Sequence, residues 1–139
     1  MGEWEVKLPP KKRGPAFQVN GIGRSYKPEL DRLESPSVLD ITWAAGVYEG
    51  EGSCFSSTPR NVTVTVSQKD EWLLERLRVY FGGRVHVTTK KSRHRGIHEW
   101  KAHGQRAVDF LTEIYLYLSP RRQAQILKLY PWQACLEGE

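Results

Sequence analysis

The sequence has few of the residues from which disulfide-rich and zinc-stapled domains are built. Its 139 residues include only two cysteines, Cys54 and Cys135, which lie far apart and in no CxxC pair. This spacing excludes a disulfide scaffold and a zinc ribbon, and it fits a reducing compartment. No apolar run approaches the ~20 residues needed to span a bilayer, and the first ten residues lack a secretory signal pattern. We therefore expect an intracellular protein with no membrane partner, in the cytoplasm of a bacterium or phage host or in an organelle.

Positive charge is concentrated in one segment of the chain. The net charge is +5, and residues 84–106 alone carry seven Lys or Arg against a single acid, Glu99. All four histidines lie in the same segment. Because phosphate neutralisation dominates the affinity of proteins for nucleic acids, this concentration indicates a surface for a polyanion. A solvated basic hairpin without a ligand is the alternative at this point.

Composition and periodicity divide the chain into three regions. Residues 1–36 are rich in Pro, Gly and Lys-Lys-Arg and show little periodicity, which predicts an N-terminal arm that is partly disordered. Residues 37–132 are expected to form one folded domain, and residues 133–139 a C-terminal tail. Within the domain we predict the elements in this order: a helix capped at Ser35 or Ser37 and ending near Glu51, strands over 53–58 and 61–67, a helix from Asp70 stopped by Gly82-Gly83, strands over 84–91 and 98–103, a helix over 107–118, and a helix from Ser119-Pro120 closed by Pro131.

This α-β-β-α-β-β-α-α order predicts an α+β fold with one four-stranded antiparallel sheet covered by helices on one face. Alternation places Val62, Val64, Val66, Val85 and Val87 toward the core and polar side chains on the other face. Two-stranded ribbons fit the major groove of DNA, where side chains read base edges and basic residues grip phosphate. The expected base-reading set is Asn61, Thr63, Thr65, Ser67, Arg84, His86 and Thr88, and the expected phosphate-contacting set is Lys90, Lys91, Arg93, Arg95 and Lys101.

The first predicted helix carries two glycines, Gly46 and Gly50, on one face. A mid-helix glycine costs roughly 0.5–1 kcal/mol relative to alanine, and a close backbone approach is the usual compensation. The approaching element is either part of the same core or the same helix of a second subunit. In the second case two Glu51 carboxylates meet near a two-fold axis, where they must take up a proton or bind cations. Carboxylate and carbonyl oxygens facing phosphate suit Mg²⁺.

The segment Ala44-Ala45-Gly46-Val47-Tyr48-Glu49-Gly50-Glu51-Gly52 resembles the nine-residue signature of the single-motif LAGLIDADG homing endonucleases. In motif and element order the resemblance covers about residues 37–131. It implies two saddle-shaped sheets in the major groove of a long, near-palindromic site. It further implies that Glu51 and the Gly50 carbonyl hold Mg²⁺, or another divalent cation such as Mn²⁺, and that Gln68 orients solvent near the metal. The implied homodimer interface comprises Thr42, Ala45, Gly46 and Gly50.

Three departures from the family pattern stand out. Ala44 replaces the opening leucine of the signature, and Tyr48 replaces a smaller apolar residue. Many members carry a catalytic lysine just after the third helix, where this chain reads Ser119-Pro120-Arg121-Arg122. An arginine there stabilises transition-state charge but cannot act as a base. Arg121 and Arg122 are the two candidates for this role, and we take Arg121 as the catalytic residue of that segment.

These features predict a Mg²⁺-dependent, sequence-specific DNA endonuclease that acts as a homodimer on double-stranded DNA. It would be an intron- or intein-type homing enzyme that hydrolyses phosphodiester bonds on both strands without a small-molecule cofactor. The missing lysine favours an alternative, a non-cleaving relative that acts as a DNA regulator or an RNA-splicing maturase. A monomeric structural module with a basic hairpin is a third possibility, and it requires the glycine face to be internal.

Overall fold

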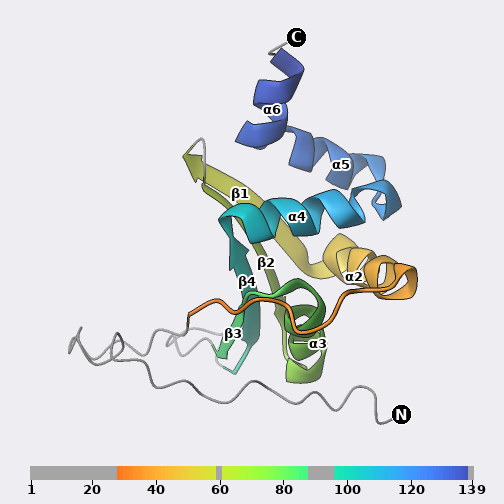
Figure 1. Cartoon of the computed structure of the whole chain (residues 1–139), viewed down its shortest axis with the longest axis vertical. Helices are drawn as coiled ribbons and strands as arrows, with labels where there is room; N and C mark the ends of the chain where they lie inside the picture. The colour runs from red at the N-terminus through yellow and green to blue at the C-terminus, as the bar shows by residue number, and fades with distance from the viewer. Residues whose placement is uncertain (1–27, 59–60, 88–95, 138–139) are drawn as a thin grey trace, which may run out of the picture.

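The computed structural model describes residues 28–58, 61–87 and 96–137, and these form an α+β fold (Figure 1). The described elements are α2 (Val38–Glu51), β1 (Gly52–Thr58), β2 (Asn61–Gln68), α3 (Glu71–Phe81), β3 (Arg84–Val87), β4 (His98–His103), α4 (Gly104–Ile114), the 3₁₀ turn η2 (Tyr115–Tyr117), α5 (Pro120–Leu127) and α6 (Tyr130–Glu137). No described helix has the length and apolar character to cross a membrane.

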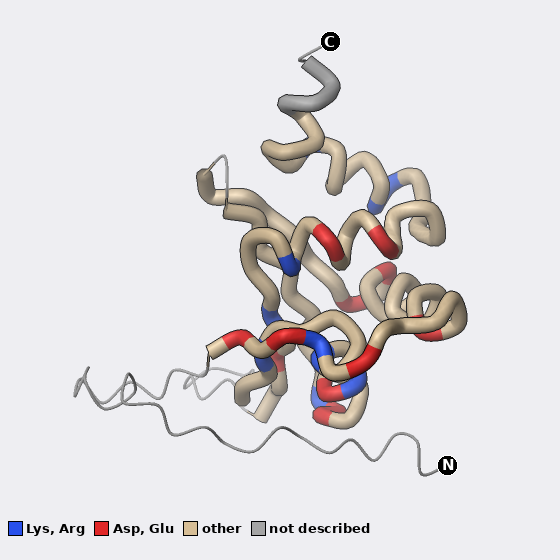
Figure 2. The backbone as a smooth tube through the Cα atoms, in the orientation of Figure 1, with Lys and Arg blue, Asp and Glu red and all other residues tan. Residues whose placement is uncertain are grey.

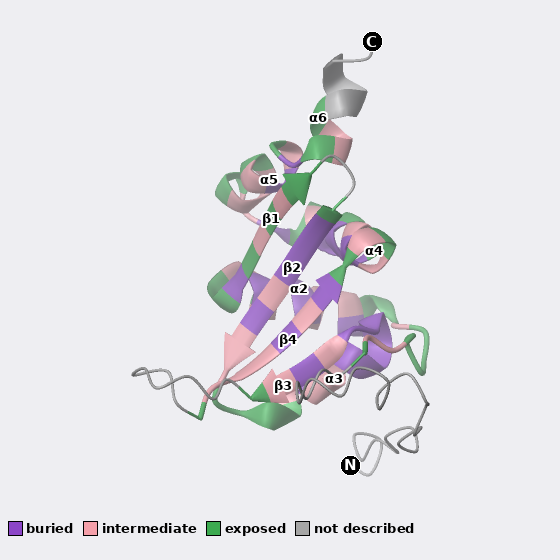
Figure 3. Cartoon of the chain, turned by 90° about the vertical axis from the view of Figure 1, so that its left-hand side faces the viewer, coloured by how far each residue is buried: buried purple, intermediate pink, exposed green. Residues whose placement is uncertain are grey.

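The four strands form one antiparallel sheet in the order β1-β2-β4-β3. The register places Val64 opposite Cys54 on one side and Ala102 on the other. Helices α2, α3 and α4 pack against one face, and Figure 3 looks onto the other face. This arrangement confirms the predicted α+β class and the antiparallel four-stranded sheet. The covered face contributes the buried side chains Val62, Val64, Val66, Val85, Trp100 and Ala102.

Local sequence signals start α2 and α5 and end α3 where predicted. Ser37 and Asp40 form a reciprocal capping box at the start of α2. Ser119 caps α5, and Pro120 occupies its first turn. Gly82 and Gly83 both have positive φ values, of 77° and 99°, and they end α3.

Three elements differ from the prediction at their ends. Pro131 does not simply close α5, because it lies in the first turn of a further helix, α6, where its missing N–H is tolerated. That helix runs into the region expected to be a tail. Strand β3 is described only over Arg84–Val87, and Val87 is 45 % exposed, although alternation predicted an inward position. The third predicted helix begins at Gly104 and ends at Ile114, with η2 completing it.

Residues 28–36, which we call the strap, lie along the body although we expected them to belong to an arm. Leu30 exchanges two backbone hydrogen bonds with Gly83, and Leu33 and Glu34 donate to the Val79 carbonyl. The Glu29 carboxylate contacts His103 and Arg106, which joins the strap to the start of α4. Figure 2 shows acidic positions, in red, along the strap. These long-range contacts tie the strap to the ends of α3 and β4. Residues 1–27 of the expected arm lie outside the described residues.

Candidate nucleic-acid interface

The glycine face of α2 is uncovered by the described part of the chain. Gly46 and Gly50 are both exposed, and a Cβ atom added at either would meet nothing within 4 Å. The face continues through Thr42, which is half-buried, to Leu39, which is 78 % exposed. We call these four residues the glycine stripe. Of the two readings left open by the sequence, packing of the glycines inside the same core is therefore wrong for the described residues.

Ala45 does not belong to this stripe, which corrects its predicted place in the dimer interface. Ala45 is 1 % exposed and packs in the core with Ala44 and Tyr48. The reason is helical spacing. Ile41, Ala44, Ala45 and Tyr48 follow the i, i+3, i+4, i+7 pattern and face the sheet, whereas the glycine stripe points the other way.

Glu51 is the last residue of α2, and it is exposed. The last turn of α2 contains no basic residue, and the carbonyls at a helix C-terminus carry partial negative charge. An exposed carboxylate beside such carbonyls is a donor set of hard oxygens, which Mg²⁺ accepts. Among the described residues no group of three or more His, Cys, Asp or Glu side chains could hold a metal ion, so a cation at Glu51 would find one carboxylate per chain. The set fits a divalent cation when a second chain or a phosphate completes it.

Gln68 ends β2 beside the end of the motif helix. Gly52 pairs with Val66 in the sheet register, so the chain running back from Gly52 into α2 lies alongside the end of β2. The Gln68 Oε1 atom accepts a hydrogen bond from the Lys69 backbone at 2.9 Å. The fold thus brings the Glu51 position, at the end of α2, close to the end of β2, where Gln68 lies.

Sequence reasoning missed a latch that joins α2 to α5, formed by Glu49, Ser119 and Arg122. The Glu49 carboxylate accepts hydrogen bonds from the Ser119 backbone N–H at 2.9 Å and from its Oγ at 2.7 Å. The Arg122 guanidinium donates twice to the Glu49 carbonyl, at 3.1 and 3.0 Å, and lies 5.1 Å from the centroid of the Tyr48 ring. The available signal was the start of α5, where Arg122 stands at the position that a capping-box acid would fill, so the Ser119 N–H needs an acceptor from elsewhere.

The two arginines of α5 therefore have different surroundings. Arg122 is engaged in the latch, whereas the Arg121 side chain is 66 % exposed, with Nη2 3.9 Å from Glu49 Oε2. Arg121 is thus available to a ligand at the end of α2.

The latch makes stability depend on pH. Hydrogen bonds from the Ser119 backbone and side chain hold the pKa of Glu49 below its ordinary value of 4.5. Because the folded-state pKa is depressed, this stabilisation is present above the unfolded-state pKa and is lost as pH falls through the folded-state pKa. We expect Ser119→Ala to lower the free energy of unfolding by about 1 kcal/mol at neutral pH, as for other lost N-caps, and to flatten its decline below pH 4.5.

Denaturant unfolding at several pH values measures both effects. Ser57→Ala is the matched control, because Ser57 is exposed on β1 and caps no helix. An acid profile that is identical in Ser119→Ala and the parent chain would contradict this role of the latch.

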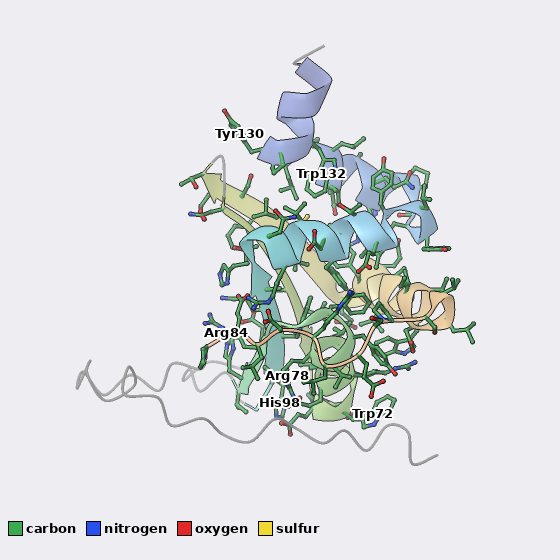
Figure 4. All side chains as sticks on the ribbon, viewed as in Figure 1. Trp72, Arg78, Arg84, His98, Tyr130 and Trp132 are labelled. Carbon is green, nitrogen blue, oxygen red and sulfur yellow. The ribbon has the colours of Figure 1, made fainter. Side chains whose placement is uncertain are left out.

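One face of the sheet is covered by no described helix, and we call it the open face. Besides Thr63, it carries six of the twelve predicted DNA contacts in cross-strand rows. Thr65 lies between Ser53 and Lys101, and Arg84 lies opposite Lys101. Figure 4 shows Arg84 on the side of the sheet away from α3. Asn61 is exposed, and Ser67, Arg84, His86 and Lys101 are half-buried.

Thr63 differs from its neighbours on this face. It is only 4 % exposed, because it lies on the central strand β2 between two larger residues, Phe55 and His103. Thr63 is therefore not accessible to a base edge in this arrangement, which corrects its predicted role. Five further predicted contacts lie outside the described residues: Thr88, Lys90, Lys91, Arg93 and Arg95.

Three described histidines of the basic segment each lie near a glutamate. His86 Nε2 is 3.1 Å from Glu99 Oε1, and His98 Nε2 is 3.7 Å from Glu71 Oε1. His103 contacts Glu29 of the strap. Composition did not reveal these pairs, because their members are up to 74 residues apart in sequence.

No family model matches the chain, and no curated protein matches it.

Proposed function

We propose that the chain is a LAGLIDADG-type homing endonuclease subunit, a Mg²⁺-dependent enzyme that cuts both strands of a specific DNA site as a homodimer. The observation that carries the proposal is the glycine stripe of α2, which is open along its length and leads to the exposed carboxylate of Glu51. A glycine face that nothing in the described chain covers is best explained by a second copy. The antiparallel sheet, whose other face is covered by no helix of the described residues (Figure 3), supplies the matching DNA surface.

Association of two copies through α2 explains why this helix carries glycines on its exposed face. Two helices that cross at Gly46 and Gly50 approach closely because neither position carries a side chain. Exposed Leu39 adds apolar area at the other end of the stripe. Burying this apolar area stabilises the dimer by roughly 25 cal/mol per Å². The same crossing places two Glu51 side chains near the two-fold axis.

The paired carboxylates explain the need for a cation. Two negative charges ~4 Å apart repel by about 4 kcal/mol at an effective dielectric constant of 20. Glu51 and the Gly50 carbonyl would hold a divalent ion there, which supplies an activated water and neutralises charge on the phosphate when it is bound. In this proposal Gln68, at the end of β2, orients solvent near the ion, and Arg121 stabilises charge on the phosphate.

DNA lies along the open face in this proposal. Strand β2 has eight residues and spans about 26 Å at ~3.3 Å per residue, which corresponds to a half-site of roughly eight base pairs. This strand carries Asn61, Thr65 and Ser67 along the DNA, and β3 carries Arg84 and His86. Two copies related by a two-fold axis would read a near-palindromic site.

A non-cleaving nucleic-acid binder with the same dimer is the second candidate. The observation that favours it is the latch, in which Arg122 is already bound to Glu49. The first turn of α5 then offers Arg121 alone, and an arginine cannot act as a general base. The second candidate shares the DNA surface with the first and differs only in catalysis.

Selection of cleaved sites from a random duplex pool tests the proposal. The full chain is incubated with the pool in Mg²⁺ or in EDTA, and newly formed ends are captured and sequenced. The expected result is one enriched, near-palindromic site that is cut only with Mg²⁺. Enrichment of bound but uncut duplexes would favour the non-cleaving binder, and absence of any enriched sequence would contradict both.

A further inference from the structure

Glu99 is the only acidic residue in the four described strands. On β4 the side chains of Trp100 and Ala102 face the core. Because side chains alternate along a strand, Glu99 belongs to the open face. The register places it opposite Ser67 on β2 and His86 on β3. An acid at this place, in the most basic segment of the chain, needs an explanation. A carboxylate that only repelled phosphate would weaken DNA binding.

Two cationic or polar partners hold the Glu99 carboxylate in place. His86 Nε2 lies 3.1 Å from Glu99 Oε1, and Lys101 Nζ lies 3.9 Å from the same oxygen. The side chains of Glu99 and Lys101 are 21 % and 25 % exposed. The open face therefore carries a hydrogen-bond acceptor and a donor side by side, each partly accessible.

This donor–acceptor pair matches the major-groove edge of one kind of base pair. Cytosine presents its N4 amino group as a donor, and guanine presents O6 and N7 as acceptors. In a C·G pair the N4 and O6 atoms are neighbours, because they are hydrogen-bonded to each other. Glutamate accepts from cytosine N4, and lysine donates to guanine O6 and N7. An A·T pair also offers a donor next to an acceptor, but the thymine methyl stands where guanine carries N7, so lysine has one acceptor there instead of two.

We propose that Glu99 and Lys101 together read a single C·G base pair in the bound DNA. The inference rests on the proposed function as a sequence-specific DNA-binding protein, and it adds a specificity determinant to it. Glu99 was not among the residues expected to contact DNA, and Lys101 was expected only to contact phosphate. In this proposal Lys101 exchanges part of its attraction to Glu99 for two guanine acceptors.

The test compares binding preferences of the full chain and of Glu99→Gln, using selection of bound sequences from a random duplex pool in Ca²⁺ or EDTA. Glutamine pairs with adenine N6 and N7, so the preferred base at one position should change from cytosine to adenine. Discrimination for C·G at that position should fall about 5- to 150-fold, which corresponds to the 1–3 kcal/mol of one good contact. Affinity for random DNA should stay equal or rise, because a negative charge is removed.

Lys101→Met is the second variant, and it should lose the preference at the same base pair. Glu113→Gln is the matched control, because Glu113 lies on α4, which covers the other face of the sheet, and its selected site should equal that of the parent chain. Circular dichroism confirms that each variant is folded.

The possible outcomes distinguish failure of the proposed C·G reading from failure of the proposed function. A Glu99→Gln protein that selects the parent site with unchanged preference at every position, or binds all sequences more weakly by one factor, overturns the reading of C·G by Glu99. Loss of preference at two different base pairs in the two variants overturns joint reading. A parent chain that selects no site at all overturns the proposed function, and this inference with it.

Discussion

Replacing Glu51 by glutamine is expected to abolish DNA cleavage and to leave DNA binding largely intact. Glutamine keeps the size of the side chain but removes the negative charge that would hold a divalent cation at the end of α2. A metal ion contributes several kcal/mol to the stabilisation of transition-state charge, so the single-turnover cleavage rate should fall at least about 10³-fold. Affinity for the selected site, measured with Ca²⁺ in place of Mg²⁺, should change little, because Glu51 lies at the helix end and not on the open sheet face.

The control for this change is Glu113→Gln, which removes the same charge from α4, away from the proposed DNA surface. It should cut at the parent rate. A Glu51→Gln protein that cuts as fast as the parent chain would refute the assignment of Glu51 as the metal-holding residue. Cleavage lost together with site binding would show that Glu51 acts in recognition or folding.

Replacing Gly46 by leucine is expected to separate the proposed dimer into folded monomers. Within one described chain the change is harmless, because a side chain at Gly46 points into open space. In a dimer the same side chain enters a close helix crossing twice, once from each copy. Overpacking of about 1–3 kcal/mol at each copy weakens association by about 30-fold to 10⁴-fold. Sedimentation across a range of concentrations measures the dissociation constant, and cleavage of both strands should be lost with the dimer.

Two variants sharpen this experiment. Gly46→Ala should raise the stability of the monomer by about 0.5–1 kcal/mol, because alanine favours the helix and meets no neighbour. It should nevertheless weaken the dimer. Ala124→Leu adds bulk at an exposed position of α5 and should leave association unchanged. A parent chain that stays monomeric at every concentration, or a Gly46→Leu protein that still pairs, would remove the basis of the dimer.

The two experiments also distinguish the candidate functions. A non-cleaving DNA binder would depend on Gly46 for high-affinity binding to a near-palindromic site, since two half-sites require two subunits. It would show no Mg²⁺-dependent cleavage for Glu51→Gln to abolish. An endonuclease would respond to both changes.

Much of the fold could be predicted because its signals are local. Ser37 and Asp40 are three residues apart, and their capping box starts α2 wherever the helix packs. The alternation of Val62, Val64 and Val66 with polar residues specifies a strand with one buried face. The first helix was harder to interpret, because its apolar residues surround nearly all of it. Only packing against the sheet showed that Ala45 is inside and Gly46 is outside.

The candidate site likewise contains residues that the sequence identified and residues that it missed. The resemblance of the motif and of its neighbouring strand predicted Glu51, Gly50 and Gln68 as site residues. The structure brings the end of α2 close to the end of β2, where these residues lie. The role of Glu49 could not be predicted, because its partner Ser119 is 70 residues away in the sequence. Thr63 was misassigned, because its burial comes from the neighbouring strands and not from its own.

By itself, then, the sequence determined the order of the helices and strands from α2 to α5, which strand face is polar, where the positive charge lies and which helix carries the acidic motif. Those properties depend on residues within a few positions of one another. The tertiary structure alone decided which face of α2 is left open, that Arg122 is bound to the end of that helix, and that Glu99 and His86 lie together on the uncovered sheet. Such contacts join residues that are distant along the chain, and they exist only once the strands have paired and the helices have packed.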